Sequence, residues 1–425
     1  MVSSDSIQTA EMLQWDKRCI YKVPASVTDL NKKAYKPQYV SFGPYHHGEA
    51  HLTLMEEHKL RALLHFLKRS QKPLESYVDS LAEVTQSLKD SYASLDPVWK
   101  RDTDRFLYLM ILDGCFMIEV MRTSTEMLND YARNDPIFSD HGKFHIVPYI
   151  KRDMLMLENQ LPMLLLTTLL AVESEQTKQD EEFVNKLVLK FCWPNLWFPP
   201  DSRMGKCVHL LDLYRKSLLW EDPRKKESSK QQIPWNGKCH EGGGQIIRSA
   251  VELYEAGIRF KKSKSRSLID ISFEDGVLRL PHIVVDDTTE SMFLNLIAFE
   301  RFHVGAGNEV TSYIFFMDNI IDSPMDVNHL HVRGIIQNAM GSDKAVAKLF
   351  NSISKDVTLD PDSSLDVVYE SVNKYCKKRY HKWRANLCHT YFRNPWAMLS
   401  VIAAVFLFAL TTLQTFYTIY STYHK

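Results

Sequence analysis

The feature that most constrains this chain is its C-terminal stretch, NPWAMLSVIAAVFLFALTTLQTFYTIYSTY, which contains no Asp, Glu, Lys, Arg or His. As a helix, residues 396–420 would extend about 37 Å, enough to cross a hydrocarbon core of roughly 30 Å with some tilt. Helices in the cores of soluble proteins seldom run this long without charge, so the sequence predicts a transmembrane helix. Aromatic side chains at both ends are typical of membrane interfaces. The residues expected in the span include Trp396, Leu399, Val401, Phe406, Leu410, Phe416 and Tyr420.

The residues before this stretch indicate its orientation. Residues 374–393 carry seven Lys or Arg and no acid, whereas only His424 and Lys425 follow the span. The positive-inside rule therefore predicts that residues 1–393 lie in the cytosol and that 421–425 form a short non-cytosolic tail. The basic side chains expected to meet anionic lipid are those of Lys377, Lys378, Arg379, Lys382, Arg384 and Arg393. Cys376 and Cys388 are candidates for palmitoylation.

The N-terminus agrees with this tail-anchored topology. The first residues, MVSSDSIQTAEMLQWDKR, lack the basic and apolar regions of a signal peptide. Seven scattered cysteines, an odd number, suit a reducing compartment, and no asparagine begins a glycosylation sequon. We expect a single-pass membrane protein with most of its chain cytosolic, at the plasma membrane rather than the endoplasmic reticulum.

Composition and charge describe the part before the anchor. Hydrophobic residues make up 45% and charged residues 24%, which excludes wholesale disorder. Lys plus Arg equals Asp plus Glu at 52 each, so there is no overall attraction toward nucleic acid. The basic run RFKKSKSR at 259–266 is short and lacks interleaved stacking aromatics, which favours a solvated face over nucleic-acid binding.

Apolar periodicity predicts a mainly α-helical cytosolic globule. Long apolar-faced helices are expected at 53–69, where Thr53 and Glu56 have capping-box spacing, and at 101–121. Residues 153–170, which contain Pro162, are expected to form a buried, kinked helix. Further helices are predicted near 182–191, 246–257, 289–303, 311–321 and 343–353.

One β element is predicted, a hairpin within SLIDISFEDGVLRLPHIVVDD that turns at Asp275–Gly276. A polar region at about 214–245 is interpreted as a linker between an N-terminal lobe, about 20–200, and a C-terminal lobe, about 246–390.

Motifs that would indicate an enzyme are missing from the sequence: there is no Gly-x-Ser-x-Gly, His-Glu-x-x-His, Walker-type loop or Gly-x-Gly-x-x-Gly. Cys207, His209, Cys239 and His240 are all zinc-type ligands, but their spacings do not match the usual pairs. The sequence therefore predicts no catalytic residue, no cofactor and no metal.

The stretch YVSFGPYHHGE at 39–49 is the most unusual segment near the N-terminus. Gly43-Pro44 predicts a tight turn, and Tyr39, Phe42 and Tyr45 are expected to hold it against the helix beginning near Thr53. The two adjacent histidines, His46 and His47, are either polar caps of this turn or residues with a role in chemistry, since imidazole titrates near neutrality.

Eight blocks in collinear order then give a resemblance. They are VSFGPYHHG, MLMLENQLPMLLL, YEAGIRF, LIDISFEDGVLRLP, NLIAFER, SYIFFMD, GIIQNAMGSDKAVAKLFN and YFRNPWAMLS. Together they resemble the plant family catalogued as domain of unknown function 247, or uncharacterised protein family 0481. The resemblance implies a plant membrane-associated protein with no established catalytic activity, and some grass members are associated with self-incompatibility loci. It carries over no catalytic residue, and the residues Phe42, Gly43, Pro44, Tyr45 and His46 become a family-signature turn.

Two functions remain open from the sequence. The first is a membrane-anchored recognition or signalling protein that contacts lipid through its C-terminal helix and an unknown protein partner through its cytosolic part, with a link to self-incompatibility as its narrower form. The second is an unrecognised hydrolase that uses His46 or His47. The sequence does not say whether the chain self-associates.

Overall fold

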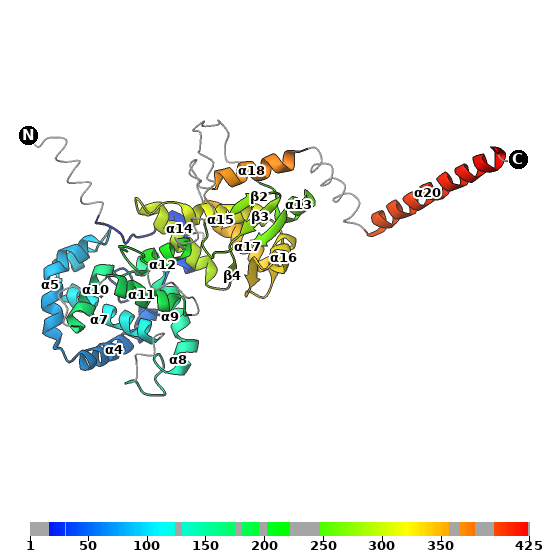
Figure 1. Cartoon of the computed structure of the whole chain (residues 1–425). Coiled ribbons are helices and arrows are strands. Elements are labelled where there is room, and N and C mark those ends of the chain that lie inside the picture. Colours follow the sequence, from blue (N-terminus) through cyan, green and yellow to red (C-terminus); the bar gives the residue numbers. More distant parts are fainter. Residues whose placement is uncertain are drawn as a thin grey trace, which may run out of the picture.

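The computed structural model describes residues 17–29, 31–123, 130–174, 181–194, 202–221, 247–356, 365–378 and 395–423, and these are mainly α-helical (Figure 1). The first half of the chain holds helices α2 (Ala25–Thr28), α3 (Lys32–Tyr35), η1 (Ala50–Leu52), α4 (Leu54–Ser70), α5 (Leu74–Asp90), α6 (Pro97–Arg101), α7 (Thr103–Arg122), α8 (Asp140–His145), α9 (Val147–Met154), η3 (Leu157–Asn159), α10 (Met163–Glu173), α11 (Glu181–Cys192) and α12 (Leu210–Leu219). Helix α7 lies at the centre of this half.

Helix α7 is buried along most of its length, and α4, α5, α10 and α11 pack around it. It begins where Oδ1 of Asp102 accepts a hydrogen bond from the Arg105 N–H at 3.0 Å, a side-chain N-cap. At Gly114 an added Cβ would lie 2.5 Å from a Leu169 methyl carbon, so glycine permits the close approach of α7 and α10.

The second half combines helices with short strands. Its helices are α13 (Ala250–Glu255), α14 (Thr289–Phe302), α15 (Glu309–Ile320), α16 (Pro324–Val332), α17 (Asp343–Ile353), η5 (Ser354–Asp356) and α18 (Asp366–Lys377). Its strands are β1 (Arg259–Lys262), β2 (Ser272–Glu274), β3 (Val277–Leu280), β4 (Ile283–Val285) and β5 (Ile336–Asn338). The strands form one sheet in the order β1-β3-β2 and a second of β4 and β5.

The predicted hairpin is confirmed as the antiparallel pair β2–β3. Asp275 and Gly276 both have positive φ, 48° and 73°, as a type I′ turn requires. The apolar alternation after β3 does not extend the hairpin, however, because β4 pairs in parallel with β5. Strand β1 also adds in parallel to β3, a long-range pairing that the sequence pattern did not indicate.

Three sequence predictions need correction. The segment 153–170 is not one kinked helix: α9 ends at Met154, and Pro162, which has no N–H to donate, stands as the N-cap of α10. The capping box at Thr53 does not form, because the Thr53 hydroxyl donates to the Ala50 carbonyl instead. On α4, Leu60 and Leu64 face outward, although their spacing within the apolar-faced helix expected at 53–69 is that of packed residues.

The linker predicted at about 214–245 overlaps the end of a helix. Residues 214–219 belong to α12, where Tyr214 and Arg215 are buried. Most of the remaining linker, 222–245, lies outside the described residues. The two halves share one hydrophobic core, since α14 packs on α3, η3 and α12.

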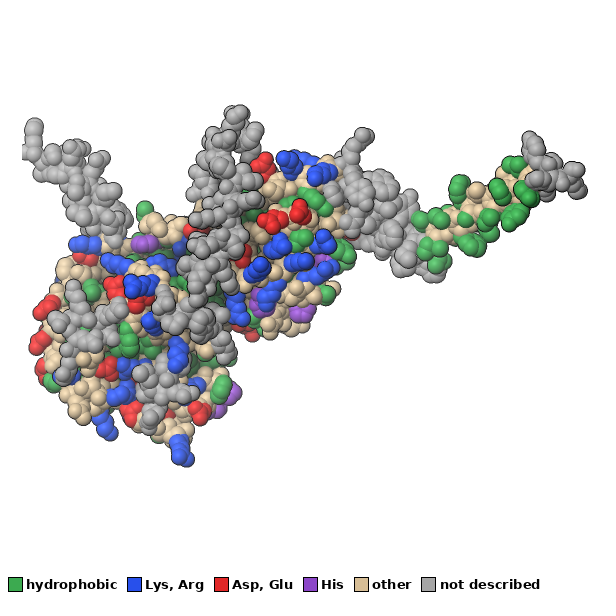
Figure 2. All heavy atoms as spheres, in the orientation of Figure 1, with side chains coloured by type: hydrophobic (Ala, Val, Ile, Leu, Met, Phe, Trp, Pro, Cys, Tyr) green, Lys and Arg blue, Asp and Glu red, His purple; other side chains and the backbone are tan. Residues whose placement is uncertain are grey.

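Helix α20 (Pro395–Tyr423) is drawn apart from the globule, and apolar side chains project from it along residues 399–420 (Figures 1 and 2). Its segment Leu399–Tyr420 is long and apolar enough to cross a membrane, and none of it is buried against the protein. The long uncharged helix predicted from the sequence is thus confirmed, whereas its insertion in a bilayer remains a prediction.

Candidate functional site

The signature segment of the sequence enters the interior and is held there through its backbone. The N–H groups of Gln38, Tyr39 and Val40 donate to Oδ2 of Asp153 over 2.9, 2.6 and 3.1 Å. Burial raises the pKa of Asp153, and the three N–H donors oppose that rise. A buried carboxylate that accepts this many backbone hydrogen bonds fixes the course of the segment before its turn.

Asn159 holds the next residues of the segment through their backbone. Its Oδ1 accepts from the Phe42 N–H at 2.7 Å, and its Nδ2 donates to the carbonyls of Val40 and Asp153 at 3.0 Å each. The buried side-chain amide of Asn159 thereby provides hydrogen-bond partners for the backbone of the signature segment and for that of Asp153.

The turn itself rests on a buried ion pair. The Gly43 N–H donates to Oδ2 of Asp113 at 2.8 Å, and Oδ1 of Asp113 lies 2.7 Å from Nζ of Lys59. Neither charged side chain of this pair is exposed. Burial raises the pKa of Asp113, while the Lys59 ammonium and the Gly43 N–H act in the opposite direction.

Gly43 has a φ of 71°, and a Cβ there would lie 2.7 Å from the Tyr92 hydroxyl. Both the backbone angle and the close approach require glycine. The aromatic residues of the signature do not all pack on α4 as predicted. Tyr39 stacks on Tyr149 of α9 at 4.6 Å between ring centroids, and Tyr45 meets Tyr92 edge-on at 5.5 Å.

His46 is held between two carboxylates. Its Nδ1 lies 2.6 Å from Oε1 of Glu49, and its Nε2 lies 3.2 Å from Oε2 of Glu158. Only 5% of His46 is exposed. Burial lowers the pKa of His46, but the two carboxylates outweigh it and the pKa is raised overall. The geometry favours a structural imidazolium whose two nitrogens are both engaged.

His47 has a different environment, with its ring edge-on to Trp99 at 5.4 Å between centroids. Neither histidine lines the cavity that the described residues form beside α14. The arrangement around the turn therefore suits a role in holding the chain together, by joining residues 38–46 to α7 and to residues 153–160.

Gln160 and His209 extend the same network to α12. The Gln160 side chain donates to the Met154 and Met156 carbonyls at 2.6 and 2.7 Å and accepts from the Leu211 N–H at 3.0 Å. Nδ1 of His209 accepts from the Asp212 N–H at 3.1 Å, which leaves Nε2 to donate to the Cys19 carbonyl at 3.1 Å.

Burial lowers the pKa of His209 to about 4, so it is neutral at physiological pH. As to the zinc-type set, Cys239 and His240 lie outside the described residues. No group of three or more His, Cys, Asp or Glu suited to a metal ion occurs among the residues that the structure describes.

The juxtamembrane residues are only partly placed. Lys377 and Lys378 are exposed at the end of α18, and burial raises the pKa of the half-buried Cys376 thiol. The predicted contacts Arg379, Lys382, Arg384 and Arg393 lie outside the described residues, as does Cys388.

Sequence reasoning missed the partners of the turn, namely Lys59, Asp113, Asp153, Glu158, Asn159 and Gln160. A signal was present, because Asp113 and the Glu-Asn-Gln run each stand inside an apolar sequence where polar side chains need a buried partner. The sequence does not say which backbone each one meets.

Comparison with known proteins gives a consistent picture. Residues 20–410 match the plant protein family of unknown function called domain of unknown function 247. UPF0481 protein At3g47200 of Arabidopsis thaliana is 34% identical over 97% of this chain and 88% of its own length. Putative UPF0481 protein At3g02645 of the same plant is 23% identical over 95% of this chain and 90% of its own length. No solved structure matches.

Proposed function

The chain belongs to the plant family of unknown function called domain of unknown function 247, and on that premise we propose that it is a membrane-anchored recognition or signalling protein. In this proposal α20 crosses the bilayer, and residues 1–393 present a folded surface to a protein partner in the cytosol. The observation that carries the proposal is α20, whose Leu399–Tyr420 segment is apolar, long enough to span and unburied by the rest of the protein.

The flanking charge supports the orientation. The described end of α18 exposes Lys377 and Lys378, and residues 379–393 add four more Lys or Arg before the span. Cytosolic flanks of membrane spans are enriched in such residues. By the same reasoning the bilayer contact is made with anionic lipid, and we favour the plasma membrane, whose cytosolic leaflet is negatively charged.

Large exposed apolar side chains support contact with a protein partner. Leu54 is 82% exposed, Phe144 78% and Leu64 59%. A protein partner would cover such side chains and gain the free energy of their burial.

Orientation is tested by adding a glycosylation acceptor sequence after Lys425 and, in a separate variant, before Met1. The proposal predicts glycan addition to the C-terminal acceptor only. Glycan on the N-terminal acceptor, or on neither while the protein resists carbonate extraction, would reverse or remove the proposed topology.

Recognition is tested by proximity labelling in plant cells with the full chain and with residues 379–425 alone as the control. A recurrent protein labelled by the full chain and by no tail-only sample supports the proposal. Identical labelling in both samples refutes a recognition role for the cytosolic part. The narrower self-incompatibility role requires alleles that diverge strongly and co-segregate with the incompatibility phenotype.

A further inference from the structure

The three-stranded sheet of the second half has one apolar face and one basic face. Side chains alternate between the two faces along a strand, and paired residues of neighbouring strands share a face. Phe260 of β1 pairs with Leu278 of β3, and both are buried. On the opposite face Lys261 pairs with Arg279, and Arg259 stands two positions before Lys261. The cations of this face therefore lie side by side, and those of β1 are exposed.

Further cations stand at the end of β1. Lys262, Lys264 and Arg266 are exposed, and His282, which follows β3, lies close enough to feel two of them. Burial lowers the pKa of His282, and the charges of Lys262 and Arg266 lower it further, as a positive local field does. The basic patch is defined here as the side chains of Arg259, Lys261, Lys262, Lys264, Arg266 and Arg279.

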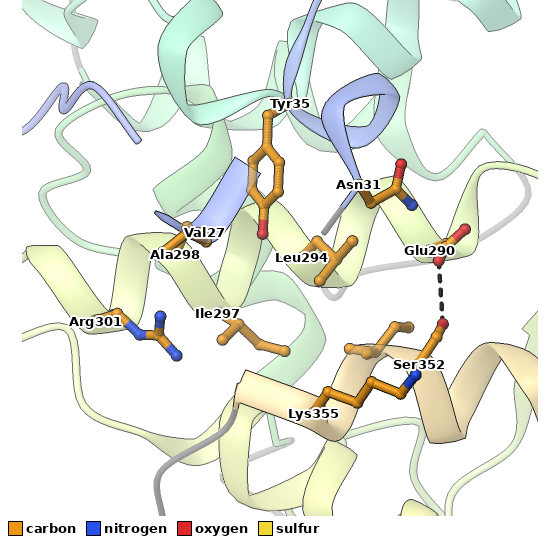
Figure 3. A pocket seen from close by; sticks show the side chains of 11 residues that line it. Val27, Asn31, Tyr35, Glu290, Leu294, Ile297, Ala298, Arg301, Ser352 and Lys355 are labelled. Carbon is orange, nitrogen blue, oxygen red and sulfur yellow. Dashed lines mark hydrogen bonds between the residues drawn. The ribbon is translucent and has the colours of Figure 1, made fainter. Parts of the chain in front are cut away.

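Few acids neutralise the basic patch. Glu274 of β2 lies 3.8 Å from Arg279, and the other cations of the patch have no ion pair with a described residue. Other charged groups of this half are engaged, as where Glu290 accepts from the Ser352 hydroxyl at 3.1 Å beside the α14 cavity (Figure 3). Figure 2 shows Lys and Arg side chains gathered on the second half of the chain. Such a surface is complementary to an anionic partner.

The same sheet is tied to the proposed anchor by a short length of chain. Helix α18 packs on β2, where Tyr375 meets Phe273 edge-on at 5.5 Å between ring centroids. Residues 378–394 connect α18 to α20, and a chain of that length spans at most about 60 Å. With α20 in a bilayer, the sheet therefore stays close to the lipid surface. A second contact with that surface is then an intramolecular event, so that even weak attraction suffices.

We propose that the basic patch docks on the anionic phospholipid surface of the membrane that α20 spans. The inference rests on the proposed anchoring of α20, and it adds a second lipid contact that sets which side of the second half faces the bilayer. Clusters of this many Lys and Arg near a membrane span suit anionic headgroups. Lysines on an edge strand also oppose pairing with another sheet edge, but that role does not call for Arg279 on the central strand β3.

The test measures lysine acetylation by peptide mass spectrometry on the full chain, in nanodiscs of phosphatidylcholine alone or with about one-third phosphatidylserine. Lys261 reports docking, because its amine reacts only while water and reagent reach it. We expect Lys261 to react about fivefold more slowly in the phosphatidylserine nanodiscs, and about 0.5 M NaCl to remove the difference. Lys186, an exposed residue of α11 in the first half, should change by less than about twofold.

The variant R259Q/R266Q removes two exposed cations of the patch and keeps Lys261 as the reporter. It should reduce the slowing to less than about twofold, whereas the matched control K186Q/K190Q, on α11, should retain about fivefold slowing.

Equal Lys261 rates in the two kinds of nanodisc, or equal slowing in R259Q/R266Q and wild type, would overturn the docking and leave the anchor intact. Protection of Lys261 by a single-stranded RNA oligonucleotide, without any response to phosphatidylserine, would overturn it in favour of nucleic acid. A chain that does not enter phosphatidylcholine nanodiscs would refute the anchor itself, and the docking with it.

Discussion

The buried pair under the signature turn gives the sharpest quantitative prediction. In Lys59→Met the apolar stem of the side chain is kept, so the change removes mainly the ammonium that lies 2.7 Å from Oδ1 of Asp113. Asp113 is fully buried and keeps one donor, the Gly43 N–H. Loss of one partner from a buried pair typically costs about 3–5 kcal/mol.

Protonation of Asp113 sets an upper limit on this cost, because a buried carboxylate that has lost its partner can take up a proton and become neutral. With an unfolded-state pKa of 3.8, protonating Asp113 takes about 1.4 kcal/mol per pH unit above that value, or about 4 kcal/mol at pH 7 and less than about 2 kcal/mol at pH 5. In the variant the folded state then binds more protons than the unfolded state. The stability deficit must therefore grow as pH rises.

The measurement is urea unfolding of the full chain in detergent micelles at pH 5 and pH 7, followed by tryptophan fluorescence. Lys68→Met is the matched control, since Lys68 is an exposed residue of the same helix, and its change should fall within about 0.5 kcal/mol of wild type. In the double variant K59M/D113N, the new side-chain amide oxygen can still accept from the Gly43 N–H, so part of the loss should be recovered. Equal stability of K59M and K68M, or a K59M deficit that is the same at both pH values, would contradict the buried ion pair of Lys59 and Asp113.

Three further predictions concern the same network. Gly43→Ala should lower the free energy of unfolding by at least about 2 kcal/mol more than Gly305→Ala. Both positions have positive φ, but only at Gly43 would the new Cβ lie 2.7 Å from a hydroxyl, and thermal unfolding of the two variants compares them. His46 has a raised pKa, so its stabilising contribution is complete below pH 6.5 and is lost as pH rises through the folded-state pKa; the stability gap between wild type and His46→Gln should be larger at pH 6 than at pH 9, and an equal gap would contradict the ion pairs. His209 has a pKa lowered to about 4, so wild type should lose up to about 3 kcal/mol as pH falls from 6.5 toward 4, and unfolding curves of His209→Gln should lack that part of the slope.

The features that sequence alone predicted are local ones. The uncharged run of α20, the buried helix α7 and the Asp275–Gly276 hairpin each depend on residues adjacent in the chain. Their periodicity and turn chemistry therefore sufficed.

The features that the sequence alone did not predict depend on contacts between distant segments. The parallel pairings of β1 with β3 and of β4 with β5 bring together strands separated by a crossover, which no local pattern specifies. Leu64 has the right spacing for a packed face, but nothing described covers it, and it is 59% exposed.

At the signature turn, too, the sequence predicted the local feature but not the distant contacts. Gly43-Pro44 predicted a turn, and the structure requires glycine at position 43. That His46 would lie between Glu49 and Glu158 depended on a residue 112 positions away, which only the folded chain reveals. Polar residues within apolar runs were the available signal for such partners.

A fluorescent fusion with and without residues 394–425 tests whether α20 anchors the protein in a membrane. The full chain should sediment with membranes and resist carbonate extraction, while the truncated chain should become soluble. If the truncated chain remains on the same membrane and equally resists extraction, α20 is not the anchor.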